Sequence, residues 1–371
     1  MVWSETLVDA KIFYRPLFRL SGTLLLAVIT ASLSMAALYL DWAAGRSPWQ
    51  IESLTLPLWI CALATAALGF SAVPMLQAIK AGQSIREDGP QSHLKKAGTP
   101  TMGGIFFIPV ALLVALAWSE FSPGVVAVVT LTFSYAFIGW LDDWQIIRRK
   151  TNKGISPRVK LAMQIAFGGA FCVWAALTQP ASIANLTLPF GNLLPLGLMM
   201  VPLGWFALVA ESNATNLTDG LDGLAAGTVA IALLALGALV APTASDLMIF
   251  CACLSGACLG FLVHNRNPAR VFMGDTGSLA LGGALAAVAI LSSNLLALFI
   301  LGGLFLVETL SVIAQVSYFK ATKGSDGIGK RLFKMSPYHN HLELSGWAET
   351  HIVAVFYLVG GLLACLTLAI F

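Results

Sequence analysis

Long apolar runs alternate with short polar connections along the whole chain. Each run holds about 20 residues, which is the length that a helix needs to cross the hydrocarbon core of a bilayer. We expect eleven transmembrane helices, at residues 18–40, 54–79, 103–119, 122–141, 159–178, 194–210, 222–241, 247–264, 278–293, 295–318 and 352–371. The pattern predicts an all-α polytopic membrane protein.

Composition supports the same fold class. Hydrophobic residues make up 58% of the 371 residues and charged residues 11%, against about 25% charged in soluble domains. The connections between the runs are short, and the longest, at about 319–351, is still only a loop. We therefore expect one integral membrane domain over residues 1–371.

Charge predicts the orientation. Of the 21 Lys and Arg residues, all but Arg46 fall before the first run or in connections on the same side of the membrane. Because basic residues in short loops stay cytoplasmic, we expect the N-terminus inside and, after an odd number of spans, Phe371 outside. The net charge of +3 then describes a basic cytoplasmic face that attracts anionic substrates and membrane lipids. No motif indicates nucleic-acid binding.

Five aspartates lie on this cytoplasmic side, at the ends of apolar runs. Unpaired carboxylates at the edge of a bilayer are expensive, so a compensating divalent cation is expected. Phosphate chemistry on a lipid is the function that this pattern favours. The five residues are Asp142, Asp143, Asp219, Asp222 and Asp275.

Two of these acids are adjacent at the end of the fourth run. Neighbouring residues of a helix point about 100° apart, so one of Asp142 and Asp143 can act while the other orients. Two acids at a helix C-terminus also oppose the macrodipole, which favours a bound ligand. The alternative is a pair of solvated acids that contact Arg148, Arg149 or Lys150.

Asn213, Asn216, Asp219 and Asp222 follow one another at a spacing of three residues. Two glycines in the same stretch favour an irregular backbone, which can fold these polar groups around a ligand in a cavity. As an alternative, the two aspartates simply cap the next helix.

Asp275 lies between glycines where another helix starts, and a carboxylate in such open backbone suits Mg²⁺, which prefers one or two carboxylates plus phosphates and water. An ordinary N-cap is the alternative.

Ahead of the third run, Lys96 and Thr101 can hold an anion beside helix-start amides, or belong to an ordinary capped start.

The last polar loop carries His339 and His341. Alternate histidines can bind a metal, transfer protons or donate to phosphate, whereas an isolated pair can also be a surface feature.

Glu308 is the one acid that we expect in mid-span. It is either functional or a protonated group that forms a hydrogen bond between helices.

Six motifs in order make the chain resemble the phospho-N-acetylmuramoyl-pentapeptide transferase family from about residue 85 to the C-terminus. They are GTPTMGG at 98–104, LDD at 141–143, NKGIS at 152–156, NLTDGLDGLA at 216–225, VFMGDTGSLALGG at 271–283 and MSPYHNHLELSGWAE at 335–349. The resemblance implies a core of ten helices with both termini outside, here residues 51–371. Residues 1–50 then add an extra N-terminal helix. Where the family usually has three consecutive histidines, this chain has Asn340 in the middle.

The resemblance also implies roles for the motif residues. The predicted catalytic residues are Asp142, Asp143, Asp275 and His339, and the predicted Mg²⁺ ligands are Asp275 and Asn216. The predicted substrate-binding residues are Lys96, Thr101, Lys153, Arg158, Asn213, Asn216, Asp219, Asp222, Asn265, Phe272 and His341.

The implied reaction moves phospho-N-acetylmuramoyl-pentapeptide from UDP-N-acetylmuramoyl-pentapeptide to undecaprenyl phosphate in the bacterial plasma membrane, giving lipid I and UMP. Both a single displacement and a covalent aspartyl intermediate remain open, and a homodimer is compatible with the sequence. One alternative is a transferase of N-acetylglucosamine phosphate, although its last cytoplasmic loop differs. The other is a cation-coupled transporter, which the gathering of polar motifs at one membrane face disfavours.

Overall fold

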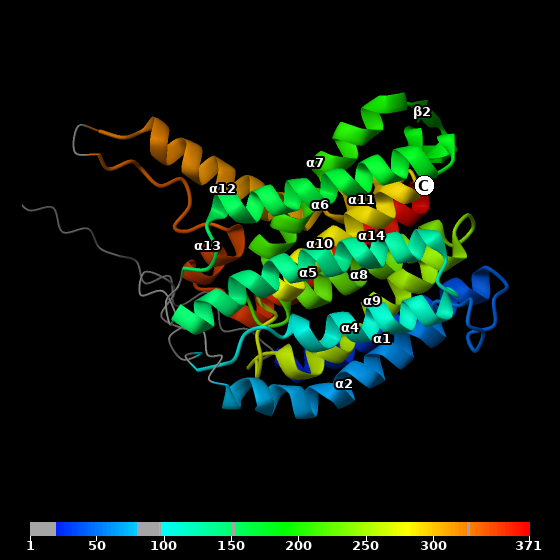
Figure 1. The fold of residues 1–371 in the computed structure, drawn as a ribbon. Coiled ribbons are helices and arrows are strands. Elements are labelled where there is room, and N and C mark those ends of the chain that lie inside the picture. The colour runs from blue at the N-terminus through cyan, green and yellow to red at the C-terminus, as the bar shows by residue number, and fades with distance from the viewer. Residues whose placement is uncertain (1–19, 80–95, 97, 150–152, 325–326) are drawn as a thin grey trace, which may run out of the picture.

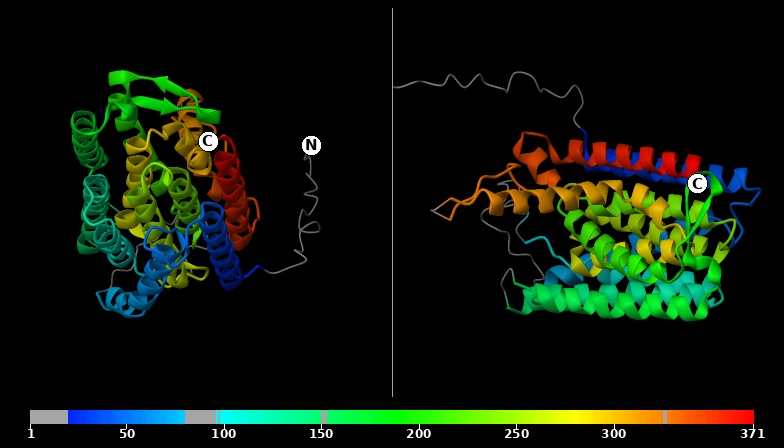
Figure 2. Two further views of the ribbon diagram at one scale, coloured as in Figure 1. Left: turned by 90° about the vertical axis from the view of Figure 1, so that its right-hand side faces the viewer. Right: turned by 90° about the horizontal axis from the view of Figure 1, so that it is seen from above.

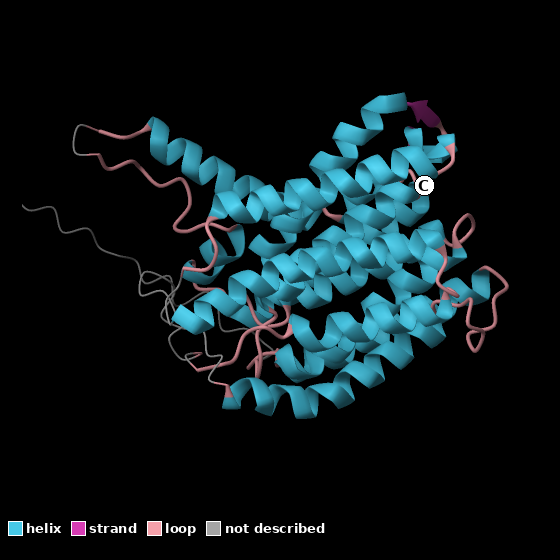
Figure 3. Cartoon of the chain, in the orientation of Figure 1, coloured by secondary structure: helices cyan, strands magenta, loops and turns pink. Residues whose placement is uncertain are grey.

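A computed structural model describes residues 20–79, 96, 98–149, 153–324 and 327–371. Lys150 and the first residue of the NKGIS motif, Asn152, lie outside the described residues. The described chain is a bundle of long helices with one small hairpin at one end (Figures 1 and 3). This architecture confirms the predicted all-α polytopic class.

Helices occupy all eleven of the predicted spans. They are α1 (Gly22–Ala43), α2 (Thr55–Ala78), α4 (Gly104–Trp118), α5 (Pro123–Arg149), α6 (Pro157–Thr178), α7 (Met200–Thr218), α8 (Leu224–Val240), α9 (Ser245–Asn265), α10 (Gly274–Leu291), α11 (Leu295–Leu301) with α12 (Gly303–Ala321), and α14 (Glu349–Ile370). A short helix, α13 (Tyr338–Leu344), lies in the last loop. Within the described ranges, eight helices are long and apolar enough to cross a membrane, and α4 and α8 are shorter apolar helices.

The structure differs from three of the predicted spans. The span predicted at 295–318 is broken between α11 and α12, where the pair Gly302 and Gly303 lowers the helix propensity. The span predicted at 194–210 starts later, because a hairpin of β1 (Asn185–Thr187) and β2 (Leu193–Pro195) precedes α7. The fourth span continues to Arg149, so its two aspartates lie inside α5 rather than at its end.

Short 3-10 turns surround this hairpin: η2 (Ala181–Ala184), η3 (Pro189–Gly191) and η4 (Gly197–Met199). The two strands are antiparallel, with Leu186 opposite Leu194.

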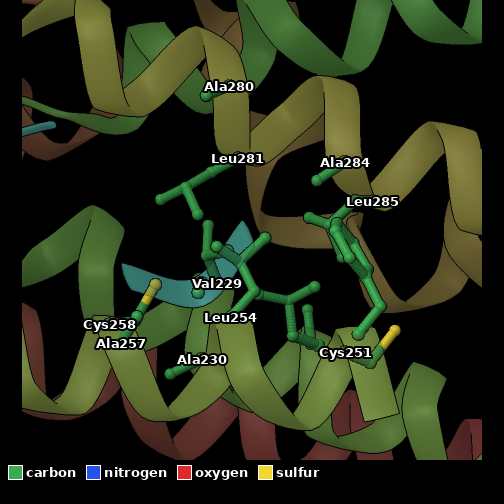
Figure 4. Packing of buried hydrophobic residues seen from close by; sticks show 14 of the residues in the cluster. Val229, Ala230, Cys251, Leu254, Ala257, Cys258, Ala280, Leu281, Ala284 and Leu285 are labelled. Atoms are coloured by element: carbon green, nitrogen blue, oxygen red, sulfur yellow. The ribbon is translucent and has the colours of Figure 1, made fainter. Parts of the chain in front are cut away.

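The core of the bundle is formed by α8, α9 and α10, which are buried along almost their whole length. Figure 4 shows their side chains interlocking, among them Val229 of α8, Leu254 of α9 and Leu285 of α10. Small residues let the backbones approach closely, as is common between membrane helices. On α9, for example, a methyl group added to Gly256 would lie 2.0 Å from the carbonyl oxygen of Leu58 on α2.

The other helices surround this core, as the end-on view in Figure 2 shows. Their outward faces expose large apolar side chains, for example Leu63, Phe133 and Leu358, as contact with lipid requires. The ends of α5 and α7 and the starts of α6, α8 and α10 meet at one end of the bundle, together with α13 (Figure 1). The predicted site residues are carried by these helix ends and their loops.

Candidate active site

Asp143 fixes the start of helix α10. Its carboxylate accepts hydrogen bonds from the backbone nitrogen atoms of Asp275 (3.2 Å) and Thr276 (3.0 Å) and from the Thr276 hydroxyl (2.6 Å). A carboxylate at a helix N-terminus is electrostatically favourable. One turn before Asp143, Gly139 makes the close approach feasible, since a Cβ there would lie 2.1 Å from the carbonyl oxygen of Asp275. Of the adjacent acids, Asp143 is therefore the orienting one.

The side chain of Asp275 is the point where three helices meet. Asn216 of α7 donates to Asp275 Oδ1 at 2.7 Å and also lies 2.9 Å from the Ser278 hydroxyl. Lys160 of α6 forms an ion pair with Asp275 Oδ2. The N-cap interpretation of Asp275 was wrong, because the capping carboxylate is that of Asp143.

Asp142 faces a cleft between α5, α6 and α7. Its Oδ1 atom accepts a hydrogen bond from the backbone nitrogen of Ile155 at 3.0 Å. The cleft has a volume of about 690 Å³, and its polar lining residues are Asp142, Arg149, Lys153, Ser156, Lys160, Gln164 and Asn213. In the described part of the chain, neither Asp142 nor Asp143 forms an ion pair with Arg148 or Arg149, so the structure disfavours a solvated headgroup pair.

Of two further predicted residues, Asn213 lines this cleft and Arg158 does not. Asn213 is turned toward α6, where its amide donates to Gln164 Oε1 at 2.9 Å and to its own helix at Val209. Arg158 is exposed on the first turn of α6 and, among the described residues, is not part of the cleft lining.

Lys96 and Asp222 belong to a buried network that ties four segments together. The ammonium group of Lys96 lies 2.7 Å from Asp222 and 2.6 Å from Glu349, the first residue of α14. Asn267 donates to both carboxylates, at 3.0 and 2.9 Å, and the backbone nitrogen of Ala269 donates to Asp222 at 3.0 Å. Burial lowers the pKa of Lys96, but the charges of Glu349 and Asp222 outweigh it and raise the pKa above its ordinary value.

Sequence reasoning missed Glu349. The only signal was its position at the end of the last motif, which gives no indication that its partners lie on other loops. The interpretation of Asp222 as a helix cap was also wrong, since its side chain does not cap α8 and its oxygens are taken by the network.

Asp219 lies in the turn between α7 and α8, close to both groups of acids. Burial, followed by the charges of Asp275 and Asp222, raises its pKa to about 7. This carboxyl is therefore easily protonated when no cation is bound nearby.

Thr101, Asn265 and Phe272 hold the loops at this end of the bundle. The backbone of Phe272 pairs with Pro100 (2.7 Å) and Gly103 (2.9 Å), which joins the loop before α4 to the loop before α10. Thr101 is buried there, and its hydroxyl would lie 2.8 Å from a Cβ added to Gly274. The buried Asn265 accepts from the Gly223 nitrogen and donates to the Val271 carbonyl.

The two predicted histidines have different surroundings. His339 is 1% exposed, so its interpretation as a surface residue was wrong. Its Nδ1 atom lies 3.1 Å from a carboxylate oxygen of Glu308, and a Cβ added to Gly220 would lie 2.2 Å from its Nε2 atom. His341 instead packs within its own loop, against the rings of Phe333 and Tyr338.

Glu308 is not the one acid in mid-span, so that expectation from the sequence was wrong. Glu211 lies in the middle of α7, and within the described ranges its Oε1 atom is buried without a hydrogen-bond partner. It was missed because the predicted span ended one residue before it. Its carboxylate faces Gly302, at the break between α11 and α12.

The donor atoms around Asp275 fit a hard cation. Within the described chain, no group of three or more His, Cys, Asp or Glu side chains is arranged to hold a metal by itself. Mg²⁺ does not need one, because it commonly takes one or two carboxylates and fills its other positions with phosphate oxygens and water. Asp275 offers a carboxylate, and the Asn216 amide, which here donates through its nitrogen, would offer a second oxygen with its two ends exchanged.

Two models of known protein families match parts of this chain and indicate the class of enzyme to which it is similar. The family model described as glycosyl transferase family 4 matches residues 125–293. A second, described as phospho-N-acetylmuramoyl-pentapeptide-transferase signature 1, matches residues 96–108.

Relatives that match over nearly their whole length indicate a more specific family. The phospho-N-acetylmuramoyl-pentapeptide-transferases of Nostoc sp. (strain PCC 7120) and Nostoc punctiforme are 65% and 64% identical over 98% of this chain, and the match covers 99% and 100% of their lengths. That of Gloeothece citriformis is 61% identical over 97% of the chain and 99% of its own length. This chain belongs to the phospho-N-acetylmuramoyl-pentapeptide-transferase family, which confirms the family expected from its motifs.

Proposed function

We propose that this membrane protein transfers phospho-N-acetylmuramoyl-pentapeptide from its UDP carrier to undecaprenyl phosphate, forming lipid I and UMP. The single observation that carries the proposal is the convergence on Asp275 of Asn216, Lys160 and Asp143, each from a different helix. The name shared by the full-length relatives gives the transferred group.

The reaction joins two anions, so charge neutralisation is its main requirement. An oxygen of the lipid phosphate attacks the phosphorus atom that bears the sugar. The bond between this phosphorus and the bridging oxygen breaks, and UMP leaves with the bridging oxygen. Fixed cations lower the repulsion between the reactants and stabilise charge on the attacking and leaving oxygens. Lys160 is already held at Asp275, and Arg149 and Lys153 line the adjoining cleft.

In this proposal the two adjacent aspartates have different roles. Asp143 holds the start of α10 and with it Asp275, while Asp142 lines the cleft and positions the lipid phosphate. The second pKa of a phosphate is near 6, so little proton remains to be removed at neutral pH. Orientation is therefore the larger part of the role of Asp142, and a single displacement needs no covalent aspartyl intermediate.

The proposal includes Mg²⁺ as cofactor. Asp275 and Asn216 would hold the ion, which when bound would neutralise phosphate oxygens and orient the reactants. The donor set described above supports this assignment, and Lys160 marks the place as one where a positive charge is stabilised.

The proposal also places this end of the bundle in the cytoplasm, as the distribution of basic residues predicts. The donor nucleotide is a soluble anion, whereas the acceptor is a lipid of the bacterial plasma membrane. A site at the ends of the helices, beside a cleft with both polar and apolar lining, supports this placement, because both reactants must reach it.

Purified protein in detergent tests the proposal. With UDP-N-acetylmuramoyl-pentapeptide, undecaprenyl phosphate and Mg²⁺, we expect release of UMP that stops when a chelator is added. UDP-N-acetylglucosamine should give no product. Equal turnover of both nucleotides would reject the assigned substrate, and cation uptake by proteoliposomes without UMP release would indicate a transporter instead.

A further inference from the structure

Glu308 and His339 form a buried pair that has no role in the reaction as described above. Glu308 lies in α12 and is 0% exposed, and His339 lies in the first turn of α13 and is 1% exposed. One carboxylate oxygen lies 3.1 Å from the ring Nδ1 atom, and the two oxygens lie 3.2 and 3.4 Å from the backbone nitrogen of the same histidine. The backbone nitrogen and the ring Nδ1 atom of His339 therefore both lie against one carboxylate.

The backbone N–H of His339 donates to both oxygens of Glu308, so we assign the carboxylate as the acceptor of the pair. With this assignment the neutral ring presents Nδ1–H to Glu308, and Nε2 is the acceptor nitrogen of the ring. A buried carboxylate with no partner would be costly, and the pairing with His339 compensates that cost. The ring cannot turn over without losing this bond.

The Nε2 atom lies beside the turn that carries Asp219 and Asp222. A Cβ added to Gly220 would lie 2.2 Å from Nε2, so the ring reaches the turn that connects Asp219 to Asp222. Glycine is the one residue that leaves room for the ring there. The imidazole thus spans from the membrane-embedded helix α12 to the acidic turn.

We propose that Glu308 is a positioning residue that holds the His339 ring in the tautomer and orientation in which Nε2 contacts a phosphate group of the substrate. The inference rests on the proposed function. Glu308 itself is buried away from the substrate and acts only through His339. Its role corresponds to that of a carboxylate that orients a catalytic histidine in other enzymes.

The proposal predicts a change in turnover rather than in substrate binding. Glu308→Gln keeps the size of the side chain but removes its charge, and its amide no longer dictates the tautomer. We expect kcat to fall roughly 10- to 100-fold, the scale on which residues that orient a histidine act. KM for the nucleotide should change less than about twofold, because the ground-state contacts remain. Glu211→Gln is the matched control, because Glu211 is another mid-helix acid with a buried carboxylate oxygen, and this variant should keep wild-type turnover.

A double-mutant cycle separates positioning from a merely structural role. In a His339→Ala background the Glu308→Gln change should have no further effect on kcat, since the ring through which it acts is absent. Equal losses in both backgrounds would overturn the inference. So would normal turnover of Glu308→Gln when His339→Ala is impaired. Absence of UMP release from the wild-type protein would instead reject the proposed function.

Spectroscopy gives a readout that does not depend on activity or on the folding of a variant. In wild-type protein with ¹⁵N-labelled histidine, at a pH where the ring is neutral, the His339 signal should show a protonated Nδ1 and an unprotonated Nε2. His339→Ala identifies that signal by its loss. A proton on Nε2 would overturn the inference.

Discussion

Asp143 accepts three hydrogen bonds from the first turn of α10, the helix that begins beside Asp275. Through this contact one acid of the LDD motif determines where the proposed magnesium ligand lies. Asp143 thus positions the start of α10, whereas the adjacent Asp142 lines the cleft.

Removal of the Asp143 carboxylate should destabilise the protein. In Asp143→Ala the three donors at the start of α10 lose their partner in a buried place, and each unsatisfied group is costly. We expect the free energy of unfolding to fall by about 1–3 kcal/mol, measured by thermal or denaturant unfolding in detergent. Asp246→Ala is the comparison variant, because Asp246 lies in the first turn of α9 and accepts two hydrogen bonds, from the Ser122 hydroxyl and the Leu247 backbone nitrogen, against the three of Asp143. Equal stability of the two variants would contradict the capping role.

Gly139→Ala should disturb the position of Asp275 directly. The added methyl group would lie 2.1 Å from the Asp275 carbonyl oxygen, so α5 and α10 must move apart. A displacement of about 1 Å in a catalytic group can cost roughly 100-fold in rate, and we expect a loss of that size in kcat for UMP release. Gly361→Ala in α14, where a methyl group meets no atom within 4 Å, is the matched control. Unchanged turnover in Gly139→Ala would show that the spacing of these helices is not critical.

Lys96 should matter for stability as well as for substrate binding. Lys96→Met leaves the buried Asp222 and the partly buried Glu349 adjacent without their cation, and breaking a buried ion pair costs up to roughly 3–5 kcal/mol. We expect a large drop in the melting temperature, of which Lys96→Met with Glu349→Gln recovers a part. Lys320→Met, at an exposed position of α12, should have little effect. A melting temperature of Lys96→Met equal to that of the wild type would contradict the network.

The stability of the metal-free protein should depend on pH through Asp219. Its pKa is raised to about 7 in the folded protein, whereas in the unfolded chain it is near 4. Between these values the folded state binds more protons, so this contribution is fully present below about pH 4 and is lost as the pH rises through about 7. In the presence of a chelator, the melting temperature of Asp219→Asn should therefore fall less over this range than that of the wild type. Parallel pH curves would contradict the raised pKa.

The sequence predicted most of the fold because the fold depends on local patterns, and the candidate residues that it singled out at the ends of apolar runs lie at one end of the bundle. Apolar runs of membrane-spanning length gave the helices, and two adjacent acids on one helix predicted that their tasks differ. Asp142 and Asp143 do point to different surroundings, the cleft and α10. The break at Gly302 could also have been predicted from the sequence, since two adjacent glycines weaken a helix.

The pairings between distant segments could not be predicted in this way. Lys160 meets Asp275, and Glu349 meets Lys96, across more than a hundred residues of sequence. Such contacts depend on how helices pack, which the apolar pattern of a single helix does not specify. For the same reason the sequence does not indicate that Glu308 contacts His339 on α13.

The most direct test of the account is the Mg²⁺ dependence of UMP release by Asp275→Asn. Because this carboxylate is the proposed ligand at which three helices meet, turnover should fall by roughly three orders of magnitude. Excess Mg²⁺ should not restore it, while Asp246→Asn should keep the wild-type titration curve. Near-normal turnover by folded Asp275→Asn, or full rescue by added Mg²⁺, would contradict the central claim that Asp275 organises the reaction.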